Sequence, residues 1–162
     1  MRARAVLALA LALVLALALA GGCWTGSVPE PRAAEPRIAE RPSLYVRIGG
    51  GGELEAIVDE LMDGIEADGR IDMYFMNADG GTIRRRLTEW LCVASRGPCR
   101  YTGKPLHEAH AGMPIGDLDF DAFVDVFTRV LHRRGIRGRE RIELVLLLRR
   151  ARADVVETSR SP

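Results

Sequence analysis

The stretch that decides the fold is YTGKPLHEAHAGM, at residues 101–113. Within it His110 follows Leu106 at helical spacing and precedes Gly112 and Met113, so we expect it on the inward side of a short helical segment. Two interpretations of such a histidine are open from these residues alone. It is either a ligand, or a core histidine bonded to backbone carbonyls.

Helical periodicity is strong on both sides of this stretch. Apolar residues recur every three to four positions in four segments, at 54–65, 83–94, 120–131 and 142–156. Glycine clusters separate the segments, and Gly135 is a candidate helix end. No window shows the alternation typical of a strand. The sequence therefore predicts an all-α domain over residues 43–157, small enough that a bound cofactor would add useful stability.

Five motifs in this domain, in order and at the expected spacing, resemble the group 1 truncated globins. They are LYVRIGG at 44–50, ADGRI at 67–71 followed by Tyr74-Phe75, LTEWLC at 87–92 followed by Gly97-Pro98, YTGK at 101–104 and AHAGM at 109–113. The resemblance covers nearly all of residues 43–157. It implies a truncated globin-like two-over-two helical sandwich around haem b.

The resemblance also implies roles for particular residues. His110 corresponds to the proximal iron ligand, a role that a neutral imidazole fills in globins. Phe75 corresponds to the aromatic residue packed on the macrocycle, and Arg86 and Tyr101 to positions near the propionates. Ile83 and Leu87 complete the expected haem-binding set. His107 is expected to face solvent or a propionate, and His132 to be exposed at a helix end.

The expected distal side departs from the family pattern. Many group 1 members carry a tyrosine on the second helix and a glutamine on the distal helix, which bond to bound oxygen. The matching positions here are Met62, Ile83 and Leu87, and none of these side chains donates a hydrogen bond. We therefore predict an apolar distal pocket, with Arg86 as the one residue whose long side chain could supply a donor instead.

The resemblance implies reversible binding of diatomic gases (oxygen, carbon monoxide or nitric oxide) at the iron. Two alternatives stay open: a haem redox or gas-sensing protein at the cell envelope, with a reductase or other electron donor as partner, and a haem-free helical interaction module. A binding protein is favoured over an enzyme, with a nitric oxide dioxygenase-type side activity left open. The net charge of +1 and alternating basic and acidic residues argue against nucleic-acid binding.

Two cysteines of the domain, Cys92 and Cys99, are close enough in sequence for the intervening loop to fold back. Either they form a disulfide, as an oxidising compartment would permit, or they are buried free thiols that pack as small apolar residues.

The first 42 residues resemble an export signal followed by a spacer. Arg2 and Arg4 precede an apolar run that ends in Leu19-Ala20-Gly21-Gly22-Cys23, which resembles a bacterial lipobox. We expect a lipoprotein-type signal peptide at 1–22, lipidation at Cys23, a proline-rich tether at 23–42 and a disordered tail at 158–162. An ordinary cleaved signal or an uncleaved membrane anchor would equally export the domain.

Overall fold

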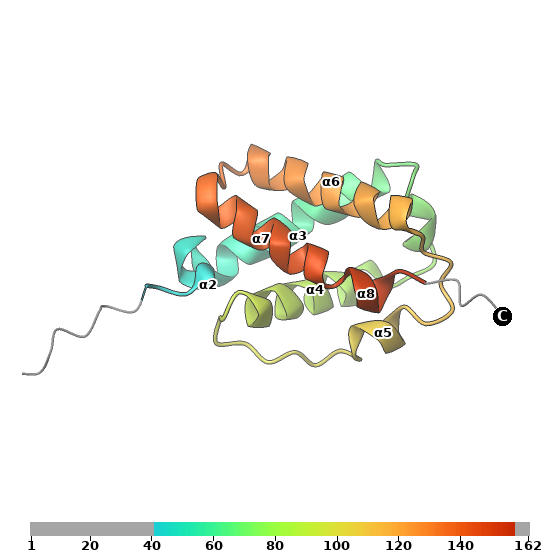
Figure 1. The fold of residues 1–162 in the computed structure, drawn as a ribbon, viewed down its shortest axis with the longest axis horizontal. Helices are drawn as coiled ribbons and strands as arrows, with labels where there is room; N and C mark the ends of the chain where they lie inside the picture. Colours follow the sequence, from blue (N-terminus) through green and yellow to red (C-terminus); the bar gives the residue numbers. More distant parts are fainter. Residues whose placement is uncertain (1–40, 158–162) are drawn as a thin grey trace, which may run out of the picture. The chain divides into compact units, whose positions relative to one another are not determined.

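The computed structural model describes residues 41–157, and within this range the regular structure is entirely helical. Four longer helices form the body: α3 (Gly50–Glu66), α4 (Gly80–Ala94), α6 (Asp117–Arg133) and α7 (Gly138–Arg150). Short helices join them: α2 (Leu44–Arg47), η1 (Asp72–Tyr74), α5 (Leu106–Ala109) and α8 (Arg152–Val155). Helices α3, α4 and α6 contain the first three predicted apolar segments, and the fourth, at 142–156, is divided between α7 and α8, which confirms the all-α expectation (Figure 1).

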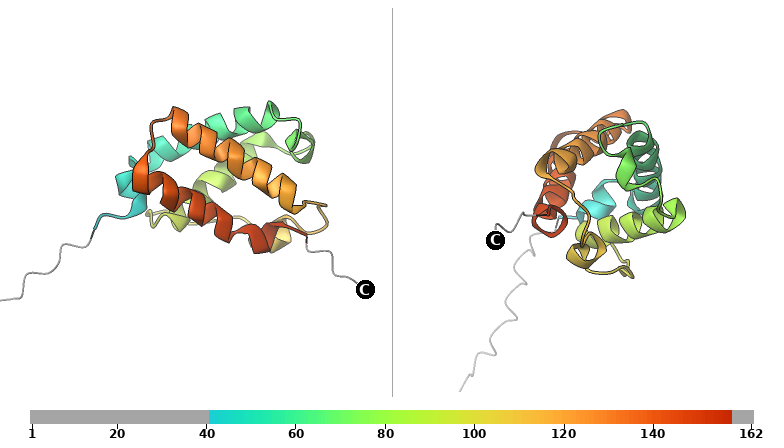
Figure 2. Two further views of the ribbon diagram at one scale, coloured as in Figure 1. Left: turned by 45° about the horizontal axis from the view of Figure 1, so that its top comes forward. Right: turned by 90° about the vertical axis from the view of Figure 1, so that its right-hand side faces the viewer.

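The helices pack as two pairs. Helix α3 contacts α4 and α6, α6 contacts α7, and α2 contacts both α3 and α7. In the end-on view of Figure 2, α6 and α7 lie on one side and α3 and α4 on the other. This is the two-over-two arrangement predicted from the sequence motifs.

Local chemistry fixes where the helices begin and end. Ser43 caps α2, and the Asp79 carboxylate caps α4 by accepting from the backbone N–H groups of Gly81 and Thr82. Helix α6 ends just before Gly135, whose φ of 75° is the left-handed conformation that glycine adopts without strain. Gly135 is therefore the helix end that the sequence indicated.

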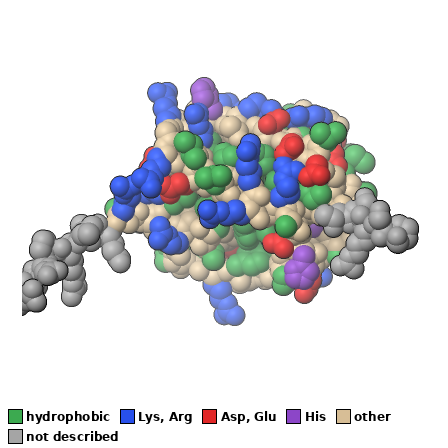
Figure 3. Space-filling view, viewed as in Figure 1, with side chains coloured by type: hydrophobic (Ala, Val, Ile, Leu, Met, Phe, Trp, Pro, Cys, Tyr) green, Lys and Arg blue, Asp and Glu red, His purple; other side chains and the backbone are tan. Residues whose placement is uncertain are grey.

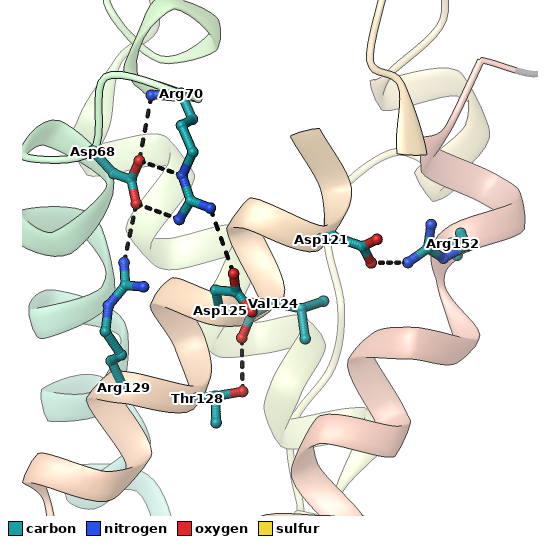
Figure 4. A network of polar contacts seen from close by, with 8 residues as sticks. All are labelled: Asp68, Arg70, Asp121, Val124, Asp125, Thr128, Arg129 and Arg152. Carbon is teal, nitrogen blue, oxygen red and sulfur yellow. Dashed lines mark hydrogen bonds and ion pairs between the residues drawn. The ribbon is translucent and has the colours of Figure 1, made fainter. Parts of the chain in front are cut away.

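The core lies between the pairs and is built from the apolar faces of α3, α4, α6 and α7. Its largest fully buried side chains include Leu54, Ile57, Leu61, Met62 and Ile65 of α3 and Phe127 of α6. The loop after α3 is fastened to α6 by Asp68, which accepts from both Arg70 and Arg129 (Figure 4).

The Cys92–Cys99 disulfide predicted as one of two alternatives is present, with its Cα atoms 5.9 Å apart. Cys92 is buried near the end of α4, so the bridge fastens the following loop to that helix. This loop leads through Tyr101 and Thr102 to α5.

In the part of the chain that the structure describes, no helix combines the length and apolarity required to cross a membrane.

Candidate functional site

A cavity of about 460 Å³ lies between α4, α5 and the C-terminal parts of α7 and α8. This volume falls within the range of small-molecule and cofactor sites, roughly 300–1,000 Å³. Its walls are mainly apolar and aromatic, and come from η1, α4, α5, α6 and α7. The apolar lining includes Ile71, Phe75, Ile83, Leu87, Trp90, Phe120, Phe123 and Leu148.

All six residues predicted to bind the cofactor line this cavity. They lie on four different parts of the chain and converge only in the folded domain: Phe75, Ile83, Arg86, Leu87, Tyr101 and His110. Ile83, Arg86 and Leu87 share one face of α4 because they recur at helical spacing.

His110 stands at the C-terminal end of α5, partly buried at the cavity wall. Its Nδ1 atom lies 2.7 Å from the backbone oxygen of Leu106. A carbonyl oxygen only accepts hydrogen bonds, so Nδ1 carries a proton, and in the neutral ring Nε2 keeps its lone pair. The same bond orients the ring, as expected of a metal-ligating histidine. The two sequence-based interpretations of His110 are thus compatible.

A polar network fixes the rim of the cavity. Arg86 donates to Glu89 over 3.0 Å, and Glu89 also accepts from the backbone N–H and the hydroxyl of Thr102. The Thr102 backbone N–H is the main cause of the lowered pKa of Glu89, which therefore stays ionised beside Arg86. Arg86 is held along the rim, and the loop that carries Tyr101 is fastened to α4.

Met62, the third predicted distal residue, is not among the side chains that line the cavity. Its side chain is 2% exposed and belongs to the hydrophobic core. Helical periodicity showed that Met62 faces inward, but α3 packs against both α4 and α6, so an inward residue can be covered by either neighbour. Of the three predicted distal residues, Ile83 and Leu87 reach the cavity.

The other hydroxyl groups of the cavity wall are already engaged. Tyr74 donates toward the Pro114 carbonyl and Asp119, at 2.9 and 3.0 Å, and Tyr101 donates to the Lys104 carbonyl at 2.9 Å. Thr82 bonds to Asp79 at the start of α4. The α4 wall therefore offers a ligand mainly the aliphatic side chains of Ile83 and Leu87.

The sequence-based set missed several lining residues. Trp90 and Phe123 lie on apolar helix faces and were indistinguishable from ordinary core residues, although both are only partly buried in the structure. Lys104 lies within the YTGK motif, yet its side chain had no assigned role. The fold brings all three to the cavity wall.

The remaining predicted positions lie elsewhere. The side chain of His107 is 66% exposed and lines a neighbouring surface groove, not this cavity. His132 is exposed in the last turn of α6, as expected. Cys23, the predicted lipidation site, lies outside the described residues.

The cavity has the chemistry that an iron porphyrin requires. A porphyrin needs an apolar slot for its ring, an axial nitrogen for iron, and cations or donors for two propionates. Phe75, Trp90 and Phe123 supply aromatic surface, and His110 supplies the nitrogen. Arg86 and Lys104 supply positive charge that can pair with carboxylates. The side chains that line the cavity therefore fit an iron porphyrin.

The sequence of the chain is similar to those of known truncated hemoglobins. A group 1 truncated hemoglobin of Tetrahymena pyriformis is 28% identical over 114 residues, covering 70% of this chain and 94% of its own length. A group 1 truncated hemoglobin from a Nostoc strain is 31% identical over 98 residues, which cover 60% of this chain and 83% of the relative.

Solved structures show the same fold. The Fe(III) form of the Tetrahymena pyriformis truncated hemoglobin superposes with a TM-score of 0.69 at 27% identity, covering 72% of this chain and all of that one. The hemoglobin of Chloroflexus aurantiacus gives a TM-score of 0.65 at 28% identity. The match covers 73% of this chain and all of that one.

The family model described as bacterial-like globin matches residues 43–156, almost the whole of the described domain. Fold, cavity and family model coincide, and the chain belongs to the bacterial-like globin family.

Proposed function

We propose that this protein binds haem b through His110 and uses the iron to bind diatomic gases reversibly. The observation that carries the proposal is the Nδ1 hydrogen bond of His110 to Leu106, at the wall of an apolar cavity lined by all six predicted haem contacts. Haem supplies an iron atom with an open coordination position, on which oxygen, carbon monoxide or nitric oxide can bind.

The chain's own residues hold and orient that group. The Leu106 carbonyl fixes the tautomer of His110, so that Nε2 is the ring atom that can bind the metal. The aromatic side chains of Phe75, Trp90 and Phe123 would exclude water from the porphyrin ring. The cationic side chains of Arg86 and Lys104 would pair with the propionates. Glu89 keeps Arg86 at the rim, where it contacts a carboxylate rather than the gas.

The aliphatic α4 wall determines ligand preference. A hydrogen-bond donor in the cavity would stabilise a ligand that becomes partly charged, such as oxygen, and would stabilise carbon monoxide much less. Ile83 and Leu87 provide no donor, and Arg86 is paired with Glu89. We expect weak oxygen retention, quick autoxidation and a strong preference for carbon monoxide. A reductase or another electron donor is part of this proposal, since oxidised iron must be returned to the ferrous state.

We also propose that the domain works outside the cytoplasm, tethered through Cys23. The basic start, the apolar run and the small residues before Cys23 support this, as does the Cys92–Cys99 disulfide, which an oxidising compartment would preserve. Mass spectrometry of the mature N-terminus is the test. A lipid on Cys23 is expected, and an unmodified N-terminus at another residue would contradict the tether.

Absorption spectra of the chain purified with haem supplied test the main proposal. We expect a Soret band in the ferric state, a shift on reduction, and a second shift with carbon monoxide. A chain that carries no Soret band would instead be a haem-free helical module.

A further inference from the structure

Helix α7 has an outer face that the globin fold does not use. Leu144 and Leu148 are buried, and Leu148 also lines the cavity. On the opposite side, Ile142 and Leu146 are four residues apart and remain 59% and 45% exposed. Packing of the domain's own core does not explain why two large aliphatic side chains lie next to each other on the solvent side of a helix.

Arginines surround this aliphatic pair. Helical spacing places Arg139, Arg149 and Arg150 on the same outer side as Ile142 and Leu146. We call this set of five residues the outer α7 face. Arg149 and Arg150 are exposed and have no salt bridge within residues 41–157.

The charge of this region is unbalanced. Arg137 and helix α7 together contain five arginines and two glutamates, a net charge of +3, whereas the whole chain has a net charge of only +1. Both glutamates, Glu140 and Glu143, are bonded to Arg47 of α2. Glu143 also accepts a hydrogen bond from Arg139 at 2.7 Å, so the arginines of α7 without a salt bridge among the described residues include Arg149 and Arg150. Figure 3 shows basic side chains spread over the side of the molecule that carries α6 and α7, with hydrophobic and several acidic side chains between them.

The chain enters the domain beside this face. The described residues begin at Arg41, immediately before α2, and α2 is joined to the first turns of α7 through Arg47. The proline-rich tether expected at 23–42 from the sequence precedes this entry point. Such a spacer allows the domain to contact the membrane that holds its lipid but does not force contact, so a preferred face must come from the domain itself.

We propose that the outer α7 face docks on an anionic phospholipid surface. Guanidinium groups of Arg139, Arg149 and Arg150 pair with lipid phosphates, while Ile142 and Leu146 enter the boundary between headgroups and acyl chains. Docking places the haem cavity about one helix diameter, roughly 10 Å, from the lipid headgroups, because inner residues of α7 line that cavity. The inference rests on the proposed tether, which would hold this face at high effective concentration near the bilayer.

The test uses the haem-loaded chain from Cys23 to Pro162 with Cys23→Ser, so that no lipid contributes. The solved truncated hemoglobin of Tetrahymena pyriformis matches 72% of this chain over its whole length, so the tested chain contains the entire matched domain. Co-sedimentation is measured with vesicles of phosphatidylcholine alone, and with vesicles containing phosphatidylglycerol. We expect binding only to the anionic vesicles, and weaker binding as salt is added.

Two charge-reversal variants locate the contact. Arg149→Glu/Arg150→Glu should weaken vesicle binding by about tenfold or more, since each arginine at a membrane surface contributes about fivefold. Arg85→Glu/Arg100→Glu makes the same change in net charge on exposed residues elsewhere and should retain most of the binding. Ile142→Ser/Leu146→Ser should weaken binding even at a salt concentration that screens the arginines.

Three results would overturn the docking proposal: no binding of the parent chain at low salt, equal losses in the two charge-reversal variants, or binding to an acidic protein but to neither kind of vesicle. The Soret band, recorded on each sample, reports separately on the proposed haem function. Mass spectrometry of the native N-terminus reports separately on the tether.

Discussion

A single hydrogen bond at His110 decides what the most important side chain of the domain can do. Nδ1 donates to the Leu106 carbonyl, which leaves Nε2 as a neutral ligand atom. The sequence indicated His110 by its spacing from Leu106, and the same spacing creates this bond, because residues four apart lie on one helix face.

Other residues show where sequence reasoning stops. Ile83 and Leu87 were predicted to face the cavity and do so, whereas Met62 was predicted by the same logic and is covered by other helices. Periodicity identifies the buried face of a helix, but only the packed structure shows which neighbour that face meets. Trp90 and Phe123 were missed for the same reason, and Lys104 was missed because it lies in a loop, where periodicity gives no indication.

The aliphatic α4 wall makes a prediction about ligand choice. Leu87→Gln places a donor in the cavity, and a hydrogen bond to a partly charged ligand contributes roughly 1.5–3 kcal/mol. Oxygen dissociation should then slow by about tenfold to hundredfold, while carbon monoxide dissociation changes little. Stopped-flow ligand exchange measures both rates.

Arg86→Ala is the control for that experiment. Arg86 is paired with Glu89, so its removal should leave oxygen dissociation nearly unchanged. If Arg86→Ala accelerates oxygen release from a chain that otherwise releases it slowly, the arginine supplies the bond and the apolar-pocket interpretation is wrong.

At the scale of elements, the four long helices were predictable and their connections were not. Apolar residues at helical spacing mark α3, α4, α6 and α7 because each helix buries one face. The short elements η1 and α8 bury too little surface to produce such a pattern. The path of residues 95–105 depends on the disulfide and on Glu89, neither of which local propensity encodes.

Close contact between α3 and α6 depends on Gly64. A Cβ atom at Gly64 would lie 2.7 Å from Cγ1 of Val126, which is itself buried. Gly64→Ala should therefore lower the free energy of unfolding by about 1–3 kcal/mol, despite the better helix propensity of alanine. Denaturant unfolding of the haem-loaded chain measures this.

Gly52→Ala is the matched variant on the same helix. No atom lies within 4 Å of the Cβ position there, so alanine should stabilise α3 by roughly 0.5–1 kcal/mol. Equal effects of the two variants would show that helix propensity, and not the contact with α6, controls both positions.

The disulfide holds the loop between α4 and α5. Cys99→Ala leaves Cys92 as a buried thiol and should lower the free energy of unfolding by about 2–3 kcal/mol. Treating the parent protein with a reductant should have a similar effect. Two cysteines in the domain that react with a thiol reagent after denaturation without reductant would show that the bridge is absent from the isolated protein.

At the scale of the whole molecule, ion pairs join distant elements and make the fold sensitive to acid. The Glu53 carboxylate on α3 accepts two hydrogen bonds from Arg134 after α6, at 2.7 and 3.0 Å. These bonds lower the pKa of Glu53 in the folded state. The stabilisation is therefore complete above the unfolded pKa of about 4.5 and is lost as the pH falls through the lower folded pKa.

Glu53→Gln should lower the free energy of unfolding by about 0.5–1 kcal/mol at neutral pH, and the difference from the parent should shrink as the pH falls below the unfolded pKa of about 4.5. Glu55→Gln, on the same helix, is the control, because the Glu55 side chain makes no hydrogen bond or salt bridge within residues 41–157. Thermal unfolding from pH 7 to 3 measures both variants, and a Glu53→Gln difference that persists unchanged in acid would contradict this assignment.

The absorption spectrum of the haem-loaded chain with His110 replaced tests the central claim most directly. His107→Ala serves as the control, because that side chain is exposed and lies outside the cavity, and far-UV circular dichroism verifies that both variants fold. We predict that His107→Ala keeps the parent's ferrous and carbon monoxide spectra, that His110→Ala loses them, and that imidazole added to His110→Gly restores them. An unchanged ferrous spectrum in folded, haem-loaded His110→Ala would contradict the claim that His110 is the iron ligand.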